Sequence, residues 1–231
     1  MELPSPETII LHSDSAIVVV NKPAGLLSIP DGYEPDLPHM RSFLAPLLGT
    51  SWIVHRLDRE TSGVMVLARS LSAHKQLNLQ FEHRQVEKTY HAWILGHPSW
   101  ASLQVEVPLK VNADRRHRTV PSLSLGKAAS TSFRVLQQFT WGCLVEAKPH
   151  TGYTHQIRSH LAFTGFPILG DDLYQALAEK KNRDLWPLAP AFNRVALHAA
   201  EIRFVHPETL EAVCFRAPYP QDISVLFETP F

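Results

Sequence analysis

Apolar residues fall in short runs between polar loops along the 231-residue chain. The runs at residues 16–20 and 63–67 are almost entirely apolar and valine-rich, and the first ends at a turn-forming sequence, so we predict that both are buried strands. Residues 89–95 alternate between two faces, with Tyr90 on one of them, which predicts another strand. Further strands are predicted over residues 130–136, 143–148, 194–204 and 212–216.

Helical signals are fewer. A helix is predicted after Ser70 or Ser72, either of which can cap it. A short helix is predicted over residues 155–163, where Thr154 precedes the first turn and Gly165 stands where a C-terminal cap belongs. Because strands outnumber helices and many are consecutive, the pattern predicts an α+β fold on a largely antiparallel or mixed sheet.

The composition is that of a folded domain. With 45% hydrophobic and 19% charged residues, it excludes a long disordered chain, and no linker or repeat divides it, so we expect one continuous domain over residues 1–231. The apolar runs are too short to span a membrane, and no secretory signal is visible. Cys143 and Cys214 exclude a disulfide framework and a four-cysteine zinc site, and they indicate buried thiols of a reducing compartment, the cytoplasm.

The formal net charge is zero, which taken alone argues against a nucleic-acid partner. The charges are unevenly distributed, however. Residues 1–50 hold 2 basic and 6 acidic residues, residues 51–170 hold 14 and 7, and residues 171–231 hold 6 and 9. A basic centre between acidic ends favours a polyanionic partner, although surface charges also cluster by chance.

The densest polar cluster is residues 55–63, directly before an apolar run. Asp58 lies there between Arg56 and Arg59, and a carboxylate flanked by guanidinium groups stays ionised at neutral pH. Such a group suits a nucleophile or a base. The alternative is a surface turn with a local ion pair of little energetic consequence.

A second polar cluster covers residues 148–160. If residues 155–163 are helical, His155 and Arg158 share one face and point toward a cleft, and the helix N-terminus at Thr154 favours phosphate. His150, His155 and His160 recur every five residues, a spacing that spreads them around a helix. We therefore expect no shared metal ion.

Two further candidates are a strand tyrosine and a basic loop. Tyr90 can stack on a base or accept a proton, although a tyrosine on a strand is more often part of the core. The loop over residues 110–118 carries Arg115, Arg116 and Arg118 against a single acidic residue, Asp114. A loop of this kind suits contacts to phosphate, although a solvated basic loop is the commoner outcome.

Together, these segments resemble the RluA-type pseudouridine synthases. The matching segments follow the family order: residues 20–25 (VNKPAG), 55–63 (HRLDRETSG), 88–90 (KTY), 126–128 (GKA), 151–158 (TGYTHQIR) and 167–171 (PILGD). They span nearly the whole chain. HRLDxxTSG with a downstream THQIR is highly specific for this family and is not a generic nucleotide loop.

The resemblance implies an isomerase that detaches uracil from its ribose and rejoins it through carbon 5. It implies a mixed, mostly antiparallel central sheet with a catalytic cleft flanked by helices and loops. Asp58 matches the essential aspartate, Tyr90 the tyrosine that packs on the uracil, and Arg158 the basic residue that pairs with the aspartate. Arg56 matches the arginine that replaces the flipped nucleotide in the RNA stack. Further expected RNA contacts are His55, Thr61, Lys88, Arg115, Arg116, Arg118 and His155.

The resemblance also sets expectations about partners. No cofactor and no metal are expected, the substrate is ribosomal or transfer RNA, no membrane is involved, and nothing requires more than a monomer. The accessory N-terminal RNA-binding module of many relatives has no room in this sequence. Tyr153 stands where relatives usually carry arginine, which removes one cation near the RNA. Asp58 either adds to the base or attacks the ribose. The alternatives are a non-catalytic RNA-binding protein on the same scaffold and a nucleoside hydrolase.

Overall fold

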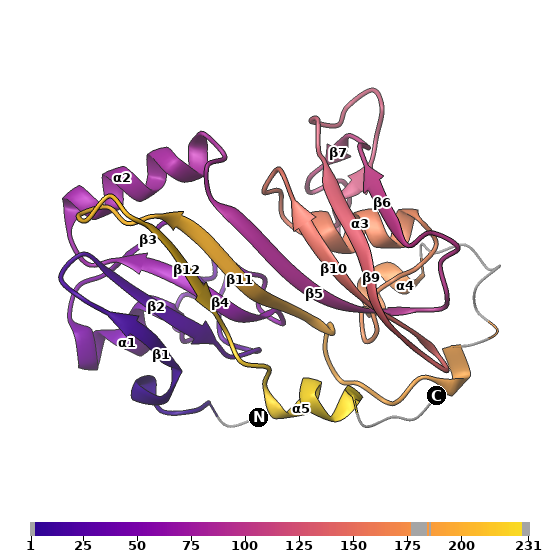
Figure 1. Ribbon diagram of the computed structural model, residues 1–231, viewed down its shortest axis with the longest axis horizontal. Helices are drawn as coiled ribbons and strands as arrows, with labels where there is room; N and C mark the ends of the chain where they lie inside the picture. Colours follow the sequence, from indigo (N-terminus) through magenta and orange to yellow (C-terminus); the bar gives the residue numbers. More distant parts are fainter. Residues whose placement is uncertain (1–2, 177–183, 185, 228–231) are drawn as a thin grey trace. The chain divides into compact units, whose positions relative to one another are not determined.

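The computed structural model describes residues 3–176, 184 and 186–227 (Figure 1). The chain forms two compact units. Unit 1 contains residues 1–88 and 198–220, and unit 2 contains residues 89–197 and 221–231. The chain passes between the units within β5 (Glu87–Leu95), at the start of β11 (Leu197–Val205) and again between residues 220 and 221. Each unit is described by itself below.

Unit 1 is built on a sheet with the strand order β1-β2-β4-β11. Its strands are β1 (Ile10–Ser13), β2 (Ile17–Lys22), β4 (Ser62–Ala68) and the main part of β11, while β3 (Trp52–Ile53) pairs with β4 and β12 (Ala212–Arg216) pairs with β11. The pairs are antiparallel except β4 with β11, which is parallel. All residues of β4 are buried, as the apolar run at 63–67 predicts.

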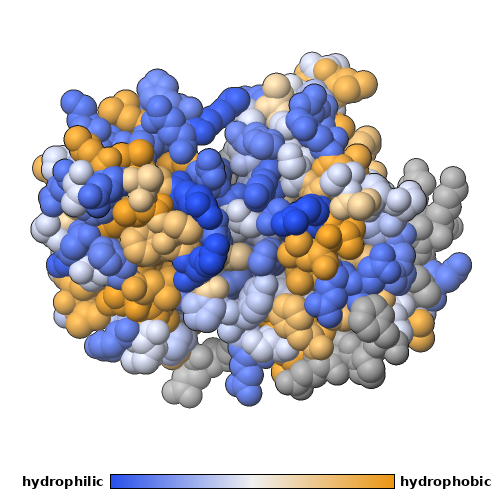
Figure 2. Space-filling model, in the orientation of Figure 1, coloured by the Kyte–Doolittle hydropathy of each residue, from blue (hydrophilic) through white to orange (hydrophobic). Residues whose placement is uncertain are grey.

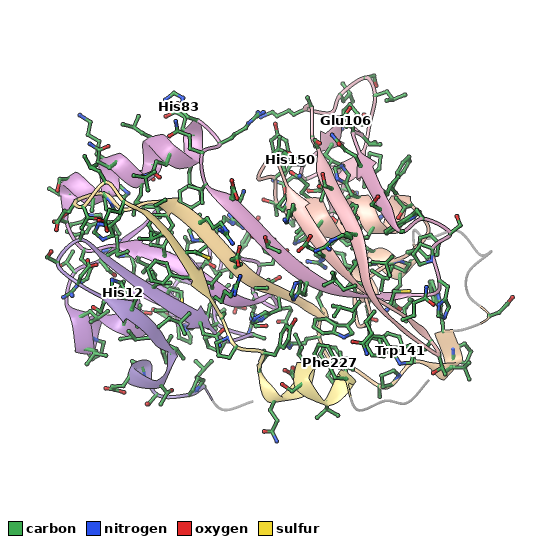
Figure 3. All side chains as sticks on the ribbon, in the orientation of Figure 1. His12, His83, Glu106, Trp141, His150 and Phe227 are labelled. Carbon is green, nitrogen blue, oxygen red and sulfur yellow. The ribbon has the colours of Figure 1, made fainter. Side chains whose placement is uncertain are left out.

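Two helices accompany this sheet. The helix α2 (Leu71–Glu82) begins at Ser70, whose hydroxyl accepts the backbone N–H of Ala73 at 3.1 Å, and its far end is near His83 in Figure 3. The helix α1 (Met40–Leu48) was not predicted from the sequence. It begins with a capping box in which His39 and Ser42 bond each other's backbone N–H groups, a local signal outside the usual Ser/Thr and Glu/Gln pair.

Unit 2 has an antiparallel sheet with the order β5-β10-β9-β6. Its strands β9 (Thr131–Phe139) and β10 (Gly142–Pro149) confirm the predicted pair, and β6 (Ser102–Val105) follows on the far side of β9. The strands β7 (Leu109–Lys110) and β8 (Val120–Pro121) form a separate hairpin. The helices are α3 (Gln156–Phe163), which lies against the β9–β10 pair in Figure 1, α4 (Asp172–Gln175) and α5 (Gln221–Ser224).

Short 3-10 turns complete the described chain: Pro6–Ile9, Trp186–Leu188 and Val225–Phe227. Phe227 meets the buried ring of Trp93 edge-on at 5.5 Å, and Trp141 stacks on Phe139 at 5.3 Å (Figure 3). These aromatic contacts extend the core of unit 2 along β5 and the β9–β10 turn. On the face shown in Figure 2, hydrophilic residues are interspersed with hydrophobic ones.

Two local expectations need correction. The helix α3 begins after His155, and Thr154 is not its cap. The side chain of Gln156 sets this start, because its carbonyl oxygen accepts from the Thr151 hydroxyl at 2.7 Å and from the Tyr153 backbone N–H at 3.1 Å. Cys143 is buried as expected, but Cys214 is exposed because it lies on the outward face of β12.

The predicted end of α3 is confirmed. Gly165 has a φ of +89° and follows the last turn, where its N–H bonds the carbonyl of Ala162 at 3.0 Å. A left-handed residue just past a helix is the position that glycine favours. Within the described residues, no helix is long and apolar enough to cross a membrane.

Candidate active site

In unit 1, Asp58 lies in the loop between β3 and β4, and its side chain is partly exposed. The carbonyl oxygen of Asp58 accepts the backbone N–H of Thr61 at 3.1 Å, which closes the loop into a tight turn. Arg56, two residues earlier, is exposed. The loop therefore holds the carboxylate of Asp58 and the guanidinium of Arg56 at the surface on a well-defined backbone.

A buried lysine supports this turn through hydrogen bonds. Lys22, at the end of β2, is completely buried, and its ammonium donates to the carbonyl oxygens of Pro23, Leu26 and Arg59 at 2.9, 2.8 and 3.2 Å. An ammonium buried without partners is very costly, so these bonds tie the chain after β2 to the residue that follows Asp58.

Further bonds hold the residues on either side of Asp58. The N–H of Gly25 donates to the carbonyl of Arg59 at 2.8 Å, and the Arg59 Nε donates back to the Gly25 carbonyl at 3.1 Å. The hydroxyl of Ser28 donates to the Leu57 carbonyl at 2.7 Å and accepts the Leu57 N–H at 3.0 Å. Both chain neighbours of Asp58 are thus hydrogen-bonded to residues 25–28, which holds the carboxylate on a rigid backbone.

His55 begins the loop as a neutral ring. It stacks on Phe81 at 4.7 Å, and its Nε2 accepts the N–H of Val66 at 3.0 Å, so the proton is on Nδ1. Burial, together with the positive charge of Lys88, lowers the pKa of His55 to about 3. This ring is better suited to fixing the loop than to neutralising a phosphate.

Two other expected RNA contacts of unit 1 are also enclosed. Thr61 is buried, and burial lowers the pKa of Lys88 below that of a free lysine. Their placement favours shaping the loop and the start of β5 over direct contact with a phosphate. Of the expected RNA contacts in unit 1, Arg56 is the exposed one.

The exit of the loop is held by a histidine that the sequence did not single out. The hydroxyl of Ser62 bonds Nδ1 of His198 at 2.9 Å, and Nε2 of His198 bonds the carbonyl of Ala217 at 3.2 Å, all in buried positions. Ser62 and His198 are register partners in the parallel pair of β4 and β11. This contact links the end of the Asp58 loop to the neighbouring strand β11. The two residues are 136 positions apart in sequence.

In unit 2, Arg158 forms a buried ion pair. Its Nε and Nη2 donate to the two oxygens of Asp171 at 2.7 and 2.8 Å, and both side chains are almost completely buried. Two parallel bonds of this kind are the strong, orienting arrangement of arginine with carboxylate. The partner that the resemblance implied for Arg158 is Asp58, which belongs to unit 1, so that pairing stays a prediction.

Tyr90 and His155 also belong to unit 2. Tyr90 lies on β5 opposite Ala147 of β10 and is partly exposed. His155 precedes α3 in a left-handed conformation, and its Nδ1 lies 3.2 Å from the hydroxyl of Tyr174. The histidines at 150 and 160 bond elsewhere, to Ser132 in one case and to Thr131 and Val107 in the other.

The basic loop lies between β7 and β8. Arg115 and Arg116 are exposed, whereas Arg118 donates to the carboxylate of Asp114 at 2.6 Å. The other oxygen of Asp114 accepts the N–H groups of Arg116 and Arg118, so the loop has a defined shape. In the described part of the chain, no group of three or more His, Cys, Asp or Glu residues could hold a metal ion.

Several residues of these networks were missed as functional residues. Lys22 and Asp171 lie inside the quoted motifs, which could have singled them out. Ser28, Tyr174 and His198 carry no signal of their own, because their role depends on partners distant along the chain.

Comparisons with known proteins identify the family of this chain. Residues 16–163 match the family described as RNA pseudouridylate synthase. The chain is 36% identical over 214 residues to the dual-specificity RNA pseudouridine synthase RluA of Escherichia coli, covering 92% of this chain and 94% of that protein. It is 35% identical to the ribosomal large subunit pseudouridine synthase D of Zymomonas mobilis, covering 95% of this chain and 71% of that protein.

The fold is matched as well. The solved structure of human RNA pseudouridylate synthase domain containing 4 superposes with a TM-score of 0.75 at 28% identity, covering 96% of this chain and 93% of that one. The α+β fold with a mixed, mostly antiparallel sheet is therefore confirmed. The chain belongs to the RluA-type RNA pseudouridine synthases, enzymes that isomerise uridine to pseudouridine in RNA.

Proposed function

We propose that this enzyme acts on specific uridines of structured ribosomal or transfer RNA and that Asp58 is its essential carboxylate. The observation that carries the proposal is the clamped loop: Ser28 bonds Leu57 and Lys22 bonds Arg59, so the backbone on both sides of Asp58 is fixed while the carboxylate stays partly exposed. A group that must meet one atom of a bulky substrate needs such a support.

The chemistry fits a carboxylate without a cofactor. In the isomerisation, the bond between N1 and C1′ breaks and a bond between C5 and C1′ forms. The proton on C5 leaves and N1 takes one up, so nothing is oxidised or reduced. Asp58 serves as the nucleophile, toward either the base or the ribose, and Asp58 or Tyr90 accepts the proton that is lost. The resemblance implies that Arg158 is the basic partner of this carboxylate.

Base flipping gives Arg56 its role. A uridine within a stacked RNA must leave the stack before its glycosidic bond can be reached, which costs a few kcal/mol. Arg56 is exposed and two residues from Asp58, so its side chain can fill the gap that the nucleotide leaves. Arg115 and Arg116 contact phosphates. We further propose that the two units act as one catalytic domain and that the enzyme works as a monomer in the cytoplasm.

The substrate can be identified by comparing the pseudouridine sites in RNA from cells with and without this gene. The relatives are named for the large ribosomal subunit and for dual specificity, which supports ribosomal and transfer RNA as the substrates. Pseudouridine mapping of total RNA with and without this gene is expected to show sites that disappear with the gene and return with the wild-type copy. Release of free uracil in place of pseudouridine would identify a hydrolase, and an unchanged map would contradict the proposed substrates.

Replacing Arg56 with alanine is expected to lower kcat/KM on the order of 10²-fold, because the flipped state loses the side chain that fills the stack. The melting temperature should stay unchanged, since Arg56 is exposed. Arg41→Ala, at another exposed arginine, provides the matched control. An RNA whose target uridine is already unstacked in a bulge should restore most of the lost rate. Equal turnover by Arg56→Ala and the wild type on stacked RNA would refute the role.

A further inference from the structure

Tyr174 of α4 links separate parts of unit 2. Its side chain is 1% exposed, and its ring and hydroxyl contact different partners. The ring lies beside the guanidinium of Arg158, and the hydroxyl lies at the end of the basic loop and next to His155. Tyr174 has no role in the proposed reaction.

The ring orients Arg158. The central carbon of the guanidinium lies 5.1 Å from the centroid of the Tyr174 ring, within the range of a cation–π contact. Asp171 adds two hydrogen bonds to the same guanidinium at 2.7 and 2.8 Å. Asp171 and Tyr174 come from one short segment, which therefore sets both the position and the plane of Arg158.

The hydroxyl anchors the basic loop. It accepts the backbone N–H of Thr119 at 2.7 Å, and Thr119 is completely buried directly after Arg118. The Thr119 hydroxyl donates in turn to the carbonyl of Thr154 at 2.7 Å, just before α3. Because Tyr174 accepts from Thr119, its own proton is available to Nδ1 of His155 at 3.2 Å.

The backbone around this anchor has three left-handed residues. His155, Asn112 and His117 have φ values of +55°, +52° and +54°, in a region that is uncommon outside glycine and that Asn and His adopt more readily than other residues. Such conformations persist only where the surrounding structure holds them, and they cluster at functional sites. Two of them lie in the basic loop and the third contacts Tyr174 itself.

We propose that Tyr174 is a positioning residue that holds Arg158 and the basic loop in one frame. The exposed Arg115 and Arg116 then meet the RNA backbone at a fixed offset from Arg158. RNA that binds the basic loop is thereby held at a defined position relative to Arg158. The inference rests on the proposed function in assigning RNA to the loop and the reaction to Arg158.

Tyr174→Phe separates the two tasks of this side chain. Phenylalanine keeps the ring beside Arg158 and removes the oxygen that accepts from Thr119. We expect the KM for RNA to rise about fivefold to tenfold, as for one buried hydrogen-bond partner lost, with kcat changed less than about twofold. Tyr174→Leu removes the ring as well, and its kcat should fall in addition. Tyr33→Phe, the same change on a side chain that is 87% exposed, is the matched control.

The dependence of RNA affinity on salt concentration is a measurement that general destabilisation of the protein would not change. Each phosphate contact contributes a slope of about −0.7 on single strands to −0.9 on duplex DNA in a plot of log K against log salt, and we expect a similar slope for RNA. Tyr174→Phe should flatten this slope by about one unit. In the Arg115→Ala/Arg116→Ala background it should flatten the slope no further, because the contacts it positions are already absent.

Binding is measured with Asp58→Asn as the background, so that it does not depend on product formation. Product formation by that background would count against Asp58 as the essential carboxylate and would leave the binding comparison intact. An unchanged KM and salt slope in folded Tyr174→Phe would overturn the inference, as would a slope change that adds fully to that of the double arginine variant. If Tyr174→Phe does not fold, Thr119→Val, which removes the bond to Thr154, must show the same rise in KM for the inference to stand.

Discussion

Replacing Asp58 with asparagine is expected to abolish pseudouridine formation while the protein folds and binds RNA as the wild type does. Asparagine has nearly the same shape, but its amide is neither a nucleophile nor a base at neutral pH. Removing the reacting group of an enzyme lowers kcat on the order of 10⁴-fold or more. Single-turnover assays with RNA labelled at the target uridine would measure this loss directly.

The neighbouring acid supplies the control for this experiment. Glu60→Gln removes the same charge from the same loop, and we expect it to keep most of the activity. RNA affinity of Asp58→Asn within about twofold of wild type would show that the loss lies in the chemical step. Pseudouridine formation by Asp58→Asn at a tenth of the wild-type rate or more would remove Asp58 from the mechanism.

Gly63→Ala should have the largest effect on stability. Gly63 has a φ of +118°, and an added Cβ would lie 2.2 Å from the carbonyl oxygen and 2.6 Å from the nitrogen of Ala199. These are backbone atoms of the paired strand β11, so neither side can move without breaking the parallel pairing. We expect a loss of roughly 3–5 kcal/mol in the free energy of unfolding, from overpacking and backbone strain together.

Two glycines separate the causes of this loss in urea denaturation. Gly25 has a φ of +87° with no atom near an added Cβ, so Gly25→Ala should report backbone strain alone, about 1–2 kcal/mol. Gly32 has neither the strained φ nor a close neighbour, and Gly32→Ala should be nearly neutral. A loss below about 1 kcal/mol for Gly63→Ala would mean that β4 and β11 can separate at this point.

Local patterns predicted the strands well because their signals lie within a few residues. The apolar run at 63–67 became β4, which is buried throughout, and the alternation at 89–95 became β5. Local patterns were less accurate at the ends of elements. The helix α3 begins one residue later than predicted, since Gln156 bonds to Thr151 and to the Tyr153 backbone.

The candidate site divides in the same way. The motif around Asp58 is contiguous, so the sequence identifies the acid and the arginine beside it. The supports of that acid are Ser28 and Lys22, which lie 29 and 37 residues from Leu57 and Arg59, the neighbours of Asp58 that they bond. The sequence also does not show that His55 stacks on Phe81 and that burial keeps its ring neutral.

By itself, the sequence determined the strands of five or more residues, the basic centre of the chain, the family and Asp58 as the candidate carboxylate. These follow from contiguous residues whose chemistry and spacing are read directly. The tertiary structure alone decided that Asp171 holds Arg158, that Ser62 bonds His198, and that Tyr174 joins Arg158 to the basic loop. The reason is physical: such contacts join residues that the path of the chain brings together, and short directional bonds form only once that path is folded.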